Sequence, residues 1–147
     1  VKGNLVSHYK SNLRDIEFNL LEVLGRGDVL GQGPYADMDV DTAREVLAEI
    51  DRLAKHELAE SFAEADRNPP VFDPATGSVT IPEGFKRSYR AFMDGQWWRL
   101  TVPPGLGGIG APRSLHWALA ELVLGANPAV SGRTIEPRVS HGRTPIR

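Results

Sequence analysis

The sequence predicts an all-α helical bundle, and three observations point to it. Four segments carry apolar residues at helical spacing, strands are indicated only as fragments, and proline or glycine separates one helical segment from the next. The chain has 147 residues, of which 41% are hydrophobic, so it suits one domain with a real core.

The first helix is expected to begin after Asn12, a residue type that caps helices, with Asp15 placed favourably against the helix dipole. Its apolar positions are Ile16, Leu20, Val23 and Leu24. Gly25 is expected to end it in the left-handed conformation. Residues 26–38 are rich in glycine, which indicates a connecting loop.

The second helix is the longest, from a cap at Asp39 or Asp41 to about Asp66. Its apolar positions are Ala43, Val46, Leu47, Ile50, Leu53, Ala54, Leu58, Phe62 and Ala65. The other face is charged, which we interpret as solvent-exposed surface, and Asp51 and Lys55 are spaced for a weak ion pair. Asn68-Pro69-Pro70 ends the helix.

A short extended piece is possible from Ser78 to Ile81. The third helix opens at Pro82-Glu83, continues through Phe92 and is closed by Gly95. The fourth is expected from Pro112 to Leu124, with Gly125 as its natural stop. Its apolar positions are Leu115, Leu119, Leu122 and Val123, with Trp117 beside them.

Residues 103–112 contain a G-x-G-x-x-G pattern, but its context argues against a dinucleotide-binding loop. Such a loop follows a continuous strand, whereas Pro103 and Pro104 interrupt the possible short strand from Trp98 to Val102. It also needs a carboxylate about 20 residues further on, and the residues about 20 beyond Gly105 are Gly, Ala and Asn.

No catalytic pair can be nominated from spacing. His8, His56, His116 and His141 are isolated from one another and from any nucleophile pattern, and there is no cysteine, so no metal site is expected. His56 is expected on a helix surface, and His116, beside Trp117, at the edge of the core. Trp97-Trp98 could stack a base or a flavin ring, although anchoring the third helix is the interpretation we favour.

Charge and hydropathy exclude several function classes. The net charge of -2 gives no general attraction to nucleic acid or anionic lipid. Residues 1–10 lack a signal-peptide core, and no run approaches the roughly 18 apolar residues of a membrane span, so we expect a cytoplasmic protein. Residues 131–147 hold four arginines against one glutamate and few apolar residues, and are expected to be disordered or out of frame.

A series of landmarks resembles the N-terminal region of acyl-CoA dehydrogenases, in a bacterial long-chain-type branch with a short leader element. The series consists of Tyr9-Lys10, Asp15, Phe18, Leu20, Glu22, Val23, Leu24, Asp66-Arg67, Pro82-Glu83-Gly84-Phe85-Lys86, Tyr89-Arg90, Gly95, Trp97, the turn at 103–110, Glu121 and Ala126-Asn127-Pro128-Ala129. Pro104 and Leu106 replace the acidic and aromatic residues usual in that turn. The likeness covers about residues 7–130 and stops after Val130.

The resemblance implies an FAD enzyme in which a carboxylate removes the α-proton of a fatty acyl-CoA and the flavin takes the β-hydride. In that family the catalytic glutamate and the main flavin contacts lie in later domains, so no catalytic, cofactor-binding or metal-binding residue is expected in this chain. Asn127, Pro128, Ala129 and Val130 are its candidate acyl contacts. The implied partners are the acyl-CoA substrate, an electron-transfer flavoprotein and further copies of the enzyme.

These observations divide the chain into a leader helix and loop (1–38), a helical domain (39–130) and a tail (131–147). The favoured hypothesis is a truncated acyl-CoA dehydrogenase of fatty acid β-oxidation that is inactive as this chain alone. The alternative is a non-catalytic helical protein-interaction module, because a truncated lobe would leave apolar stripes uncovered. Nucleic-acid binding by the arginines of the tail is a third, weaker hypothesis, since no recognised module accompanies them.

Overall fold

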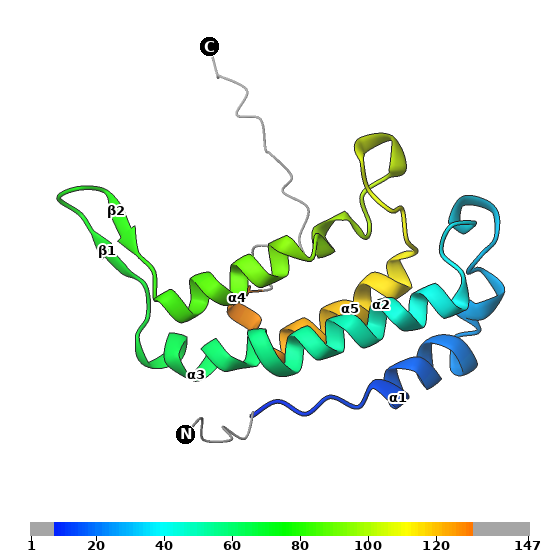
Figure 1. The fold of residues 1–147 in the computed structure, drawn as a ribbon, viewed down its shortest axis with the longest axis horizontal. Helices are drawn as coiled ribbons and strands as arrows, with labels where there is room; N and C mark the ends of the chain where they lie inside the picture. The colour runs from blue at the N-terminus through cyan, green and yellow to red at the C-terminus, as the bar shows by residue number, and fades with distance from the viewer. Residues whose placement is uncertain (1–7, 131–147) are drawn as a thin grey trace, which may run out of the picture.

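The computed structural model describes residues 8–130, and the predicted tail at 131–147 lies outside them. Helices dominate these residues, so the predicted all-α class is confirmed (Figure 1). The α-helices are α1 (Leu13–Glu17), α2 (Val40–Leu53), α3 (Ala59–Arg67), α4 (Glu83–Asp94) and α5 (Arg113–Ala126). The other helical elements are the π-helices η1 (Phe18–Val23) and η4 (Ala54–Leu58) and the 3₁₀ turns η2 (Arg26–Asp28), η3 (Gly33–Tyr35), η5 (Trp97–Arg99) and η6 (Pro104–Leu106).

The first helix begins where Asn12 predicted, but the Asn12 side chain makes no capping hydrogen bond to the backbone. Its amide instead donates to the carboxylate of Asp15. Gly25 is left-handed at φ +59°, as predicted. The apolar stripe is buried only at Ile16 and Leu20, while Val23 and Leu24 are exposed, because the chain turns to η1 after Glu17 and its side chains no longer follow the α-helical spacing.

The glycine-rich loop that follows closes one end of the core. Its 3₁₀ turns η2 and η3 leave Leu30 and Met38 buried. The Gly31 amide donates to the Met38 carbonyl at 2.8 Å, which closes the loop before α2 begins. The leader therefore supplies core side chains, while its separation from the helical domain at residue 38 stays a prediction.

Asp39 is the cap of the long helix, since its carboxylate accepts the Thr42 amide at 2.7 Å. The helix is not uniform, however: η4 separates α2 from α3 and widens the turn around His56. The predicted pair forms, with Lys55 Nζ 2.7 Å from Asp51 Oδ2. Asp51 itself is buried and also accepts from Ser11, so this position is more than exposed surface.

A small antiparallel hairpin follows α3, which ends at Arg67 as the prolines after it predicted. The strands are β1 (Val71–Asp73) and β2 (Ser78–Thr80), with Val71 opposite Thr80 and Phe72 opposite Val79. The extended piece from Ser78 is thus confirmed. Its partner strand was missed, because three residues between prolines give too little pattern to recognise.

After the hairpin, α4 follows the prediction and ends before Gly95. A side chain at Gly95 would collide with the Trp97 ring, so the glycine is required by packing. The short strand suggested at Trp98 to Val102 is wrong: η5 stands there, because Gln96 turns left-handed at φ +54° and starts a 3₁₀ turn.

The expected stop of the last helix at Gly125 is also wrong, since α5 continues to Ala126. Gly125 keeps helical geometry and its missing side chain makes room for the Tyr9 ring. Sequence reasoning took a glycine near a helix end for a terminator, whereas here it permits close approach of another segment.

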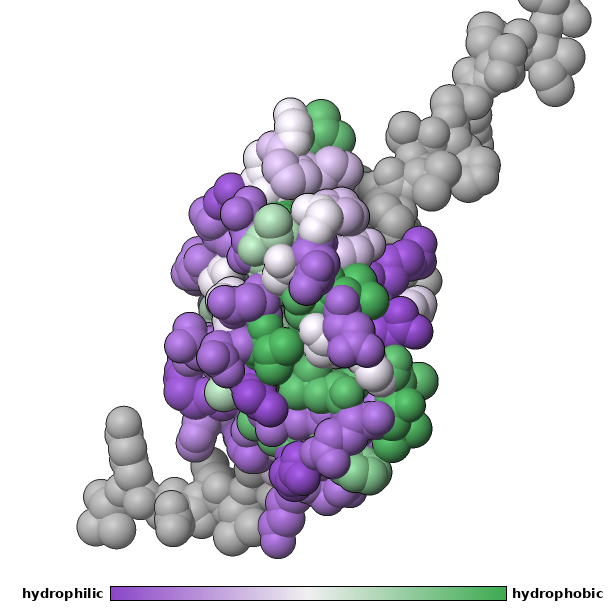
Figure 2. All heavy atoms as spheres, turned by 90° about the vertical axis from the view of Figure 1, so that its right-hand side faces the viewer, coloured by the Kyte–Doolittle hydropathy of each residue, from purple (hydrophilic) through white to green (hydrophobic). Residues whose placement is uncertain are grey.

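The core lies between α2, η4, α4 and α5, and the N-terminal segment (residues 8–12) runs beside the long helix (Figure 1). His8 stacks on Phe62 with ring centroids 4.5 Å apart, which anchors this segment. At the end of the molecule where η1 and the start of α5 lie, hydrophobic residues gather on the surface (Figure 2). Exposed large apolar residues include Phe18 and Val23 of η1, Leu24 directly after it, Leu106 of η6, Ile109 of the same turn, and Trp117 of α5.

Candidate functional site

The candidate acyl-contact residues lie where the chain leaves α5. Pro128 disfavours helical geometry in the residue before it, and Asn127 is accordingly extended at φ −160° and ψ 93°. Residues 128–130 are helical again, and the Val130 amide donates to the Asn127 carbonyl at 3.1 Å. Asn127 and Val130 are buried, whereas Pro128 and Ala129 are exposed.

The Asn127 side chain joins the end of α5 to the long helix. Its amide nitrogen donates to the Leu58 carbonyl at 3.1 Å and to the Ser61 hydroxyl at 3.0 Å. Only 1% of Asn127 is exposed, so a donor without partners there would cost about 1–3 kcal/mol. Both acceptors lie at the junction of η4 and α3, which places the start of the 128–130 turn against that junction.

A third buried polar side chain completes what we call the Ser61–Ser88–Asn127 network. The Ser88 hydroxyl donates to the Glu57 carbonyl at 2.5 Å, and its oxygen lies 2.7 Å from the Ser61 hydroxyl oxygen. Sequence reasoning missed both serines. The available signal was a serine on the buried side of a helix: Ser61 stands three residues after Leu58, and Ser88 four before Phe92.

A small open pocket of about 150 Å³ adjoins this network, lined by Glu57, Glu60, Ser61, Gly84, Arg87 and Ser88. Glu57 Oε2 is buried at this junction and has no hydrogen-bond partner among residues 8–130. The pocket brings two carboxylates and two hydroxyls near one guanidinium. It pairs no nucleophile with a histidine, so its chemistry is that of polar contacts rather than of acyl transfer.

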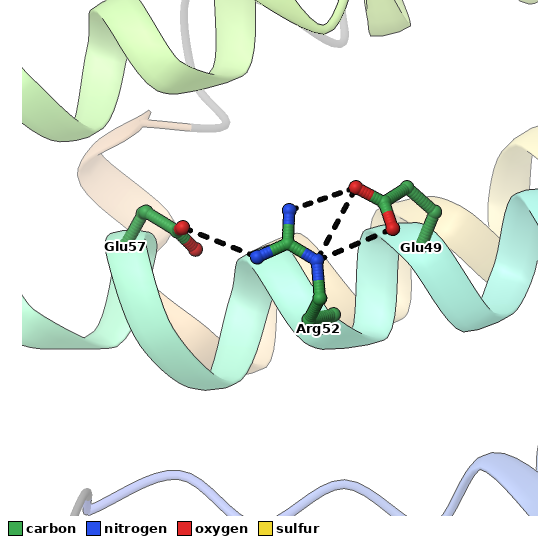
Figure 3. Close-up of polar contacts among 3 residues, drawn as sticks. All are labelled: Glu49, Arg52 and Glu57. Atoms are coloured by element: carbon green, nitrogen blue, oxygen red, sulfur yellow. Dashed lines mark hydrogen bonds and ion pairs between the residues drawn. The ribbon is translucent and has the colours of Figure 1, made fainter.

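Arg52 links two carboxylates across the α2–η4 boundary (Figure 3). Its guanidinium lies 2.8 Å from Glu49 Oε1 and 3.3 Å from Glu57 Oε1. Its hydrogen bonds to Glu49, and then to Glu57, raise the pKa of Arg52, and the bond to Arg52 lowers the pKa of Glu49. The Arg52 and Glu49 side chains are about half exposed and Glu57 is partly exposed, so this cluster adds little stability and fits the predicted charged surface.

The histidines of the described part of the chain are dispersed. His56 is exposed, as expected, and His116 is half-buried against Trp117 in an edge-on arrangement with ring centroids 5.5 Å apart. Burial, and then the positive charge of Arg113, lower the pKa of His116. Trp97 packs on the core beside α4, which supports its anchoring role, while Trp98 is exposed. His141 lies outside the described residues.

The glycine-rich turn is held by its own backbone. The Gly108 amide donates to the Pro103 carbonyl, the Gly110 amide to Val102, and the Ile109 amide to Arg99. Phosphate-binding loops need free amides, so this turn does not fit the diphosphate of a flavin or nicotinamide cofactor. The structure therefore supports the reading of the G-x-G-x-x-G pattern as a turn.

Among residues 8–130, no group of three or more histidine or acidic side chains is arranged to hold a metal ion. Nor does that part of the chain contain a helix both long and apolar enough to cross a membrane.

Comparison with known proteins gives two relatives, while no protein-family model matches. The chain is 55% identical over 125 residues to the broad-specificity linear acyl-CoA dehydrogenase FadE5 of Mycobacterium tuberculosis, a match that covers 85% of this chain and 20% of that protein. It is 29% identical over 119 residues to the 3-methylmercaptopropionyl-CoA dehydrogenase of Ruegeria pomeroyi, covering 81% of this chain and 20% of that protein.

The chain thus spans about a fifth of the length of both relatives. The resemblance recognised from the ordered landmarks is confirmed, because both relatives are acyl-CoA dehydrogenases by description.

Proposed function

We propose that this chain, whose homologues are acyl-CoA dehydrogenases, forms the helical lobe that walls the fatty tail of the substrate in such an enzyme. The observation that carries the proposal is the 55% identity to FadE5 extending over 85% of the chain. Because that match covers only a fifth of the relative, the activity belongs to a larger protein than these residues.

In this proposal the complete enzyme removes two hydrogens from a fatty acyl-CoA in β-oxidation, and bound FAD accepts the hydride. This chain contributes apolar surface and shape, while the proton-abstracting carboxylate and the flavin contacts come from other domains. One observation supports this separation of roles: the glycine-rich turn uses its backbone amides in internal hydrogen bonds.

Residues 127–130 form the proposed acyl-contact segment. Pro128 and Ala129 are the exposed members and would touch the tail, whereas Asn127 and Val130 face the interior. A proline and an alanine offer an apolar surface with little conformational freedom, which suits contact with a hydrocarbon chain.

We extend the proposal to the setting of the enzyme. Residues 1–38 act as its leader and residues 39–130 as its N-terminal domain; it works in the cytoplasm as a homo-oligomer and passes electrons to an electron-transfer flavoprotein. These points are what the resemblance to acyl-CoA dehydrogenases implies for the complete enzyme.

The proposal is tested by exchange into a holoenzyme. The matched segment of FadE5 is replaced by the corresponding 125 residues of this chain, and the purified chimera is assayed for FAD content and acyl-CoA oxidation. We expect FAD bound in equal amount to the parent and dehydrogenation of acyl-CoA. A folded chimera that binds FAD but does not oxidise an acyl-CoA would contradict the proposed role of this chain.

The claim that this chain alone is inactive has its own test. The 147-residue chain is expressed by itself and assayed in the same way. A yellow preparation with stoichiometric FAD that oxidises an acyl-CoA would contradict it. Reading the coding DNA in three frames past Val130 gives a further check, since a frame that restores a helix and a β-domain supports the truncation hypothesis.

A second candidate function is a helical protein-interaction module. It is favoured by the exposed large apolar residues next to η1 and in α5, among them Leu24, Trp117 and Leu124. Such a module should be soluble and should melt cooperatively without other domains. Aggregation of the isolated chain, or melting without a transition, would rule this candidate out.

A further inference from the structure

The exposed pair Pro128-Ala129 is held between two buried neighbours. On one side stands Asn127, which is 1% exposed, and on the other Val130, which is fully buried. The Val130 amide donates to the Asn127 carbonyl, so the two anchors are also bonded to each other. The position of Pro128 and Ala129 therefore depends on the contacts that hold Asn127.

Asn127 is held by the long helix. Its amide nitrogen donates to a backbone carbonyl at Leu58 and a hydroxyl at Ser61, three residues apart on successive turns. Two acceptors in different directions fix the orientation of the amide as well as its position. η4 ends at Leu58 and α3 begins at Ala59, so the geometry of that junction determines the position of the Asn127 side chain.

We infer that Asn127 is a positioning residue for the acyl chain: through Leu58 and Ser61 it sets where Pro128 and Ala129 meet a long fatty tail. The inference rests on the proposed function and adds to it a residue that discriminates chain length without touching substrate. A long acyl chain extends as far as Pro128 and Ala129, and a short one does not. A shift of these two residues thus changes the binding of long substrates, while the reacting carbons, next to the thioester, keep their position.

The test uses the chimeric holoenzyme with palmitoyl-CoA and butyryl-CoA as substrates. Asn127→Leu keeps the number and branching of the side-chain heavy atoms and removes both N–H donors, and Ser61→Ala removes one acceptor with a smaller risk to folding. We expect KM for palmitoyl-CoA to rise about fivefold in Asn127→Leu, the scale of one lost hydrogen bond, and less in Ser61→Ala. The KM for butyryl-CoA and the kcat for both substrates should stay within about twofold of the parent chimera.

Ser88→Ala is the matched control. It removes a hydroxyl from the same network but leaves both acceptors of Asn127 in place. We expect it to lower the melting temperature while both KM values stay unchanged. The inference is overturned if Asn127→Leu and Ser61→Ala behave like Ser88→Ala, or if they change both substrates equally. An inactive parent chimera would instead overturn the proposed function, and this inference with it.

Discussion

The ring of Tyr9 occupies the space that a side chain on Gly125 would need. A Cβ atom at Gly125 would lie 2.6 Å from Tyr9 Cε2, well inside van der Waals contact. Tyr9 belongs to the N-terminal segment and Gly125 to the last turn of α5, so one missing methyl group lets two distant parts of the sequence meet.

This contact predicts the effect of Gly125→Ala. In a free helix the change would stabilise by roughly 0.5–1 kcal/mol, since glycine is a poor helix former. Here we expect a loss of about 1–3 kcal/mol from overpacking against the ring, measured by urea unfolding. In a Tyr9→Ala background the sign should reverse. A stabilising Gly125→Ala in the otherwise unchanged chain would show that the ring moves aside freely.

The glycine-rich turn gives a matched pair of substitutions. A Cβ at Gly108 would run into the Val102 backbone carbonyl, whereas a Cβ at Gly105 meets nothing within 4 Å and φ there is not positive. Gly108→Ala should therefore cost at least about 3 kcal/mol, and Gly105→Ala should change stability by less than about 1 kcal/mol. Chemical denaturation of the two variants distinguishes them. Equal effects would mean that the turn does not keep this backbone geometry.

Tyr9 predicts a pH dependence in the alkaline range. Burial, and then the negative charges of Asp51 and Glu121, raise the pKa of Tyr9 to about 12, against an ordinary value of 10. Because the folded state holds this proton more tightly, its stabilising contribution is complete below pH 10 and is lost as pH rises toward 12.

The measurement is the free energy of unfolding from pH 9 to 12, compared between the parent chain and Tyr9→Phe. We expect the free energy of unfolding to fall more steeply with rising pH in the parent chain than in Tyr9→Phe, because only the parent chain has the Tyr9 proton to lose. Parallel curves would show that Tyr9 titrates alike in the folded and unfolded states.

His116 predicts a pH dependence of stability in the acidic range. Burial and Arg113 lower its pKa in the folded state, so the unfolded chain takes up the proton first on acidification. Its contribution to stability is therefore present above the ordinary pKa near 6.5 and is lost as pH falls through the lower, folded value. Arg113→Ala should raise the pKa of His116 without restoring it fully, because burial is the larger cause. NMR titration of the imidazole measures this, and an unchanged pKa would exclude the Arg113 contribution.

Much of the fold follows from local sequence. Asp39 before an apolar repeat predicted the start of α2, Asn68-Pro69 the end of α3, and Pro82 the start of α4. These signals suffice because caps and prolines act on the backbone within a few residues. The ordered landmarks likewise sufficed to recognise homologues among acyl-CoA dehydrogenases. The acyl contacts at 127–130 and the domain division at residue 38 stay predictions.

Tertiary structure decided what depends on distant partners. Gly125 carries the same local signal whether it ends a helix or makes room for Tyr9, and only the packed chain chooses between them. Ser61, Ser88 and Asn127 look like ordinary polar residues until the packed helices bring Ser61 within hydrogen-bond distance of Ser88, 27 residues away in sequence, and of Asn127, 66 residues away. Short-range rules set the starts of α2 and α4 and the end of α3. Burial decides which glycines and polar side chains connect the helices, since burial arises only when separate segments pack together.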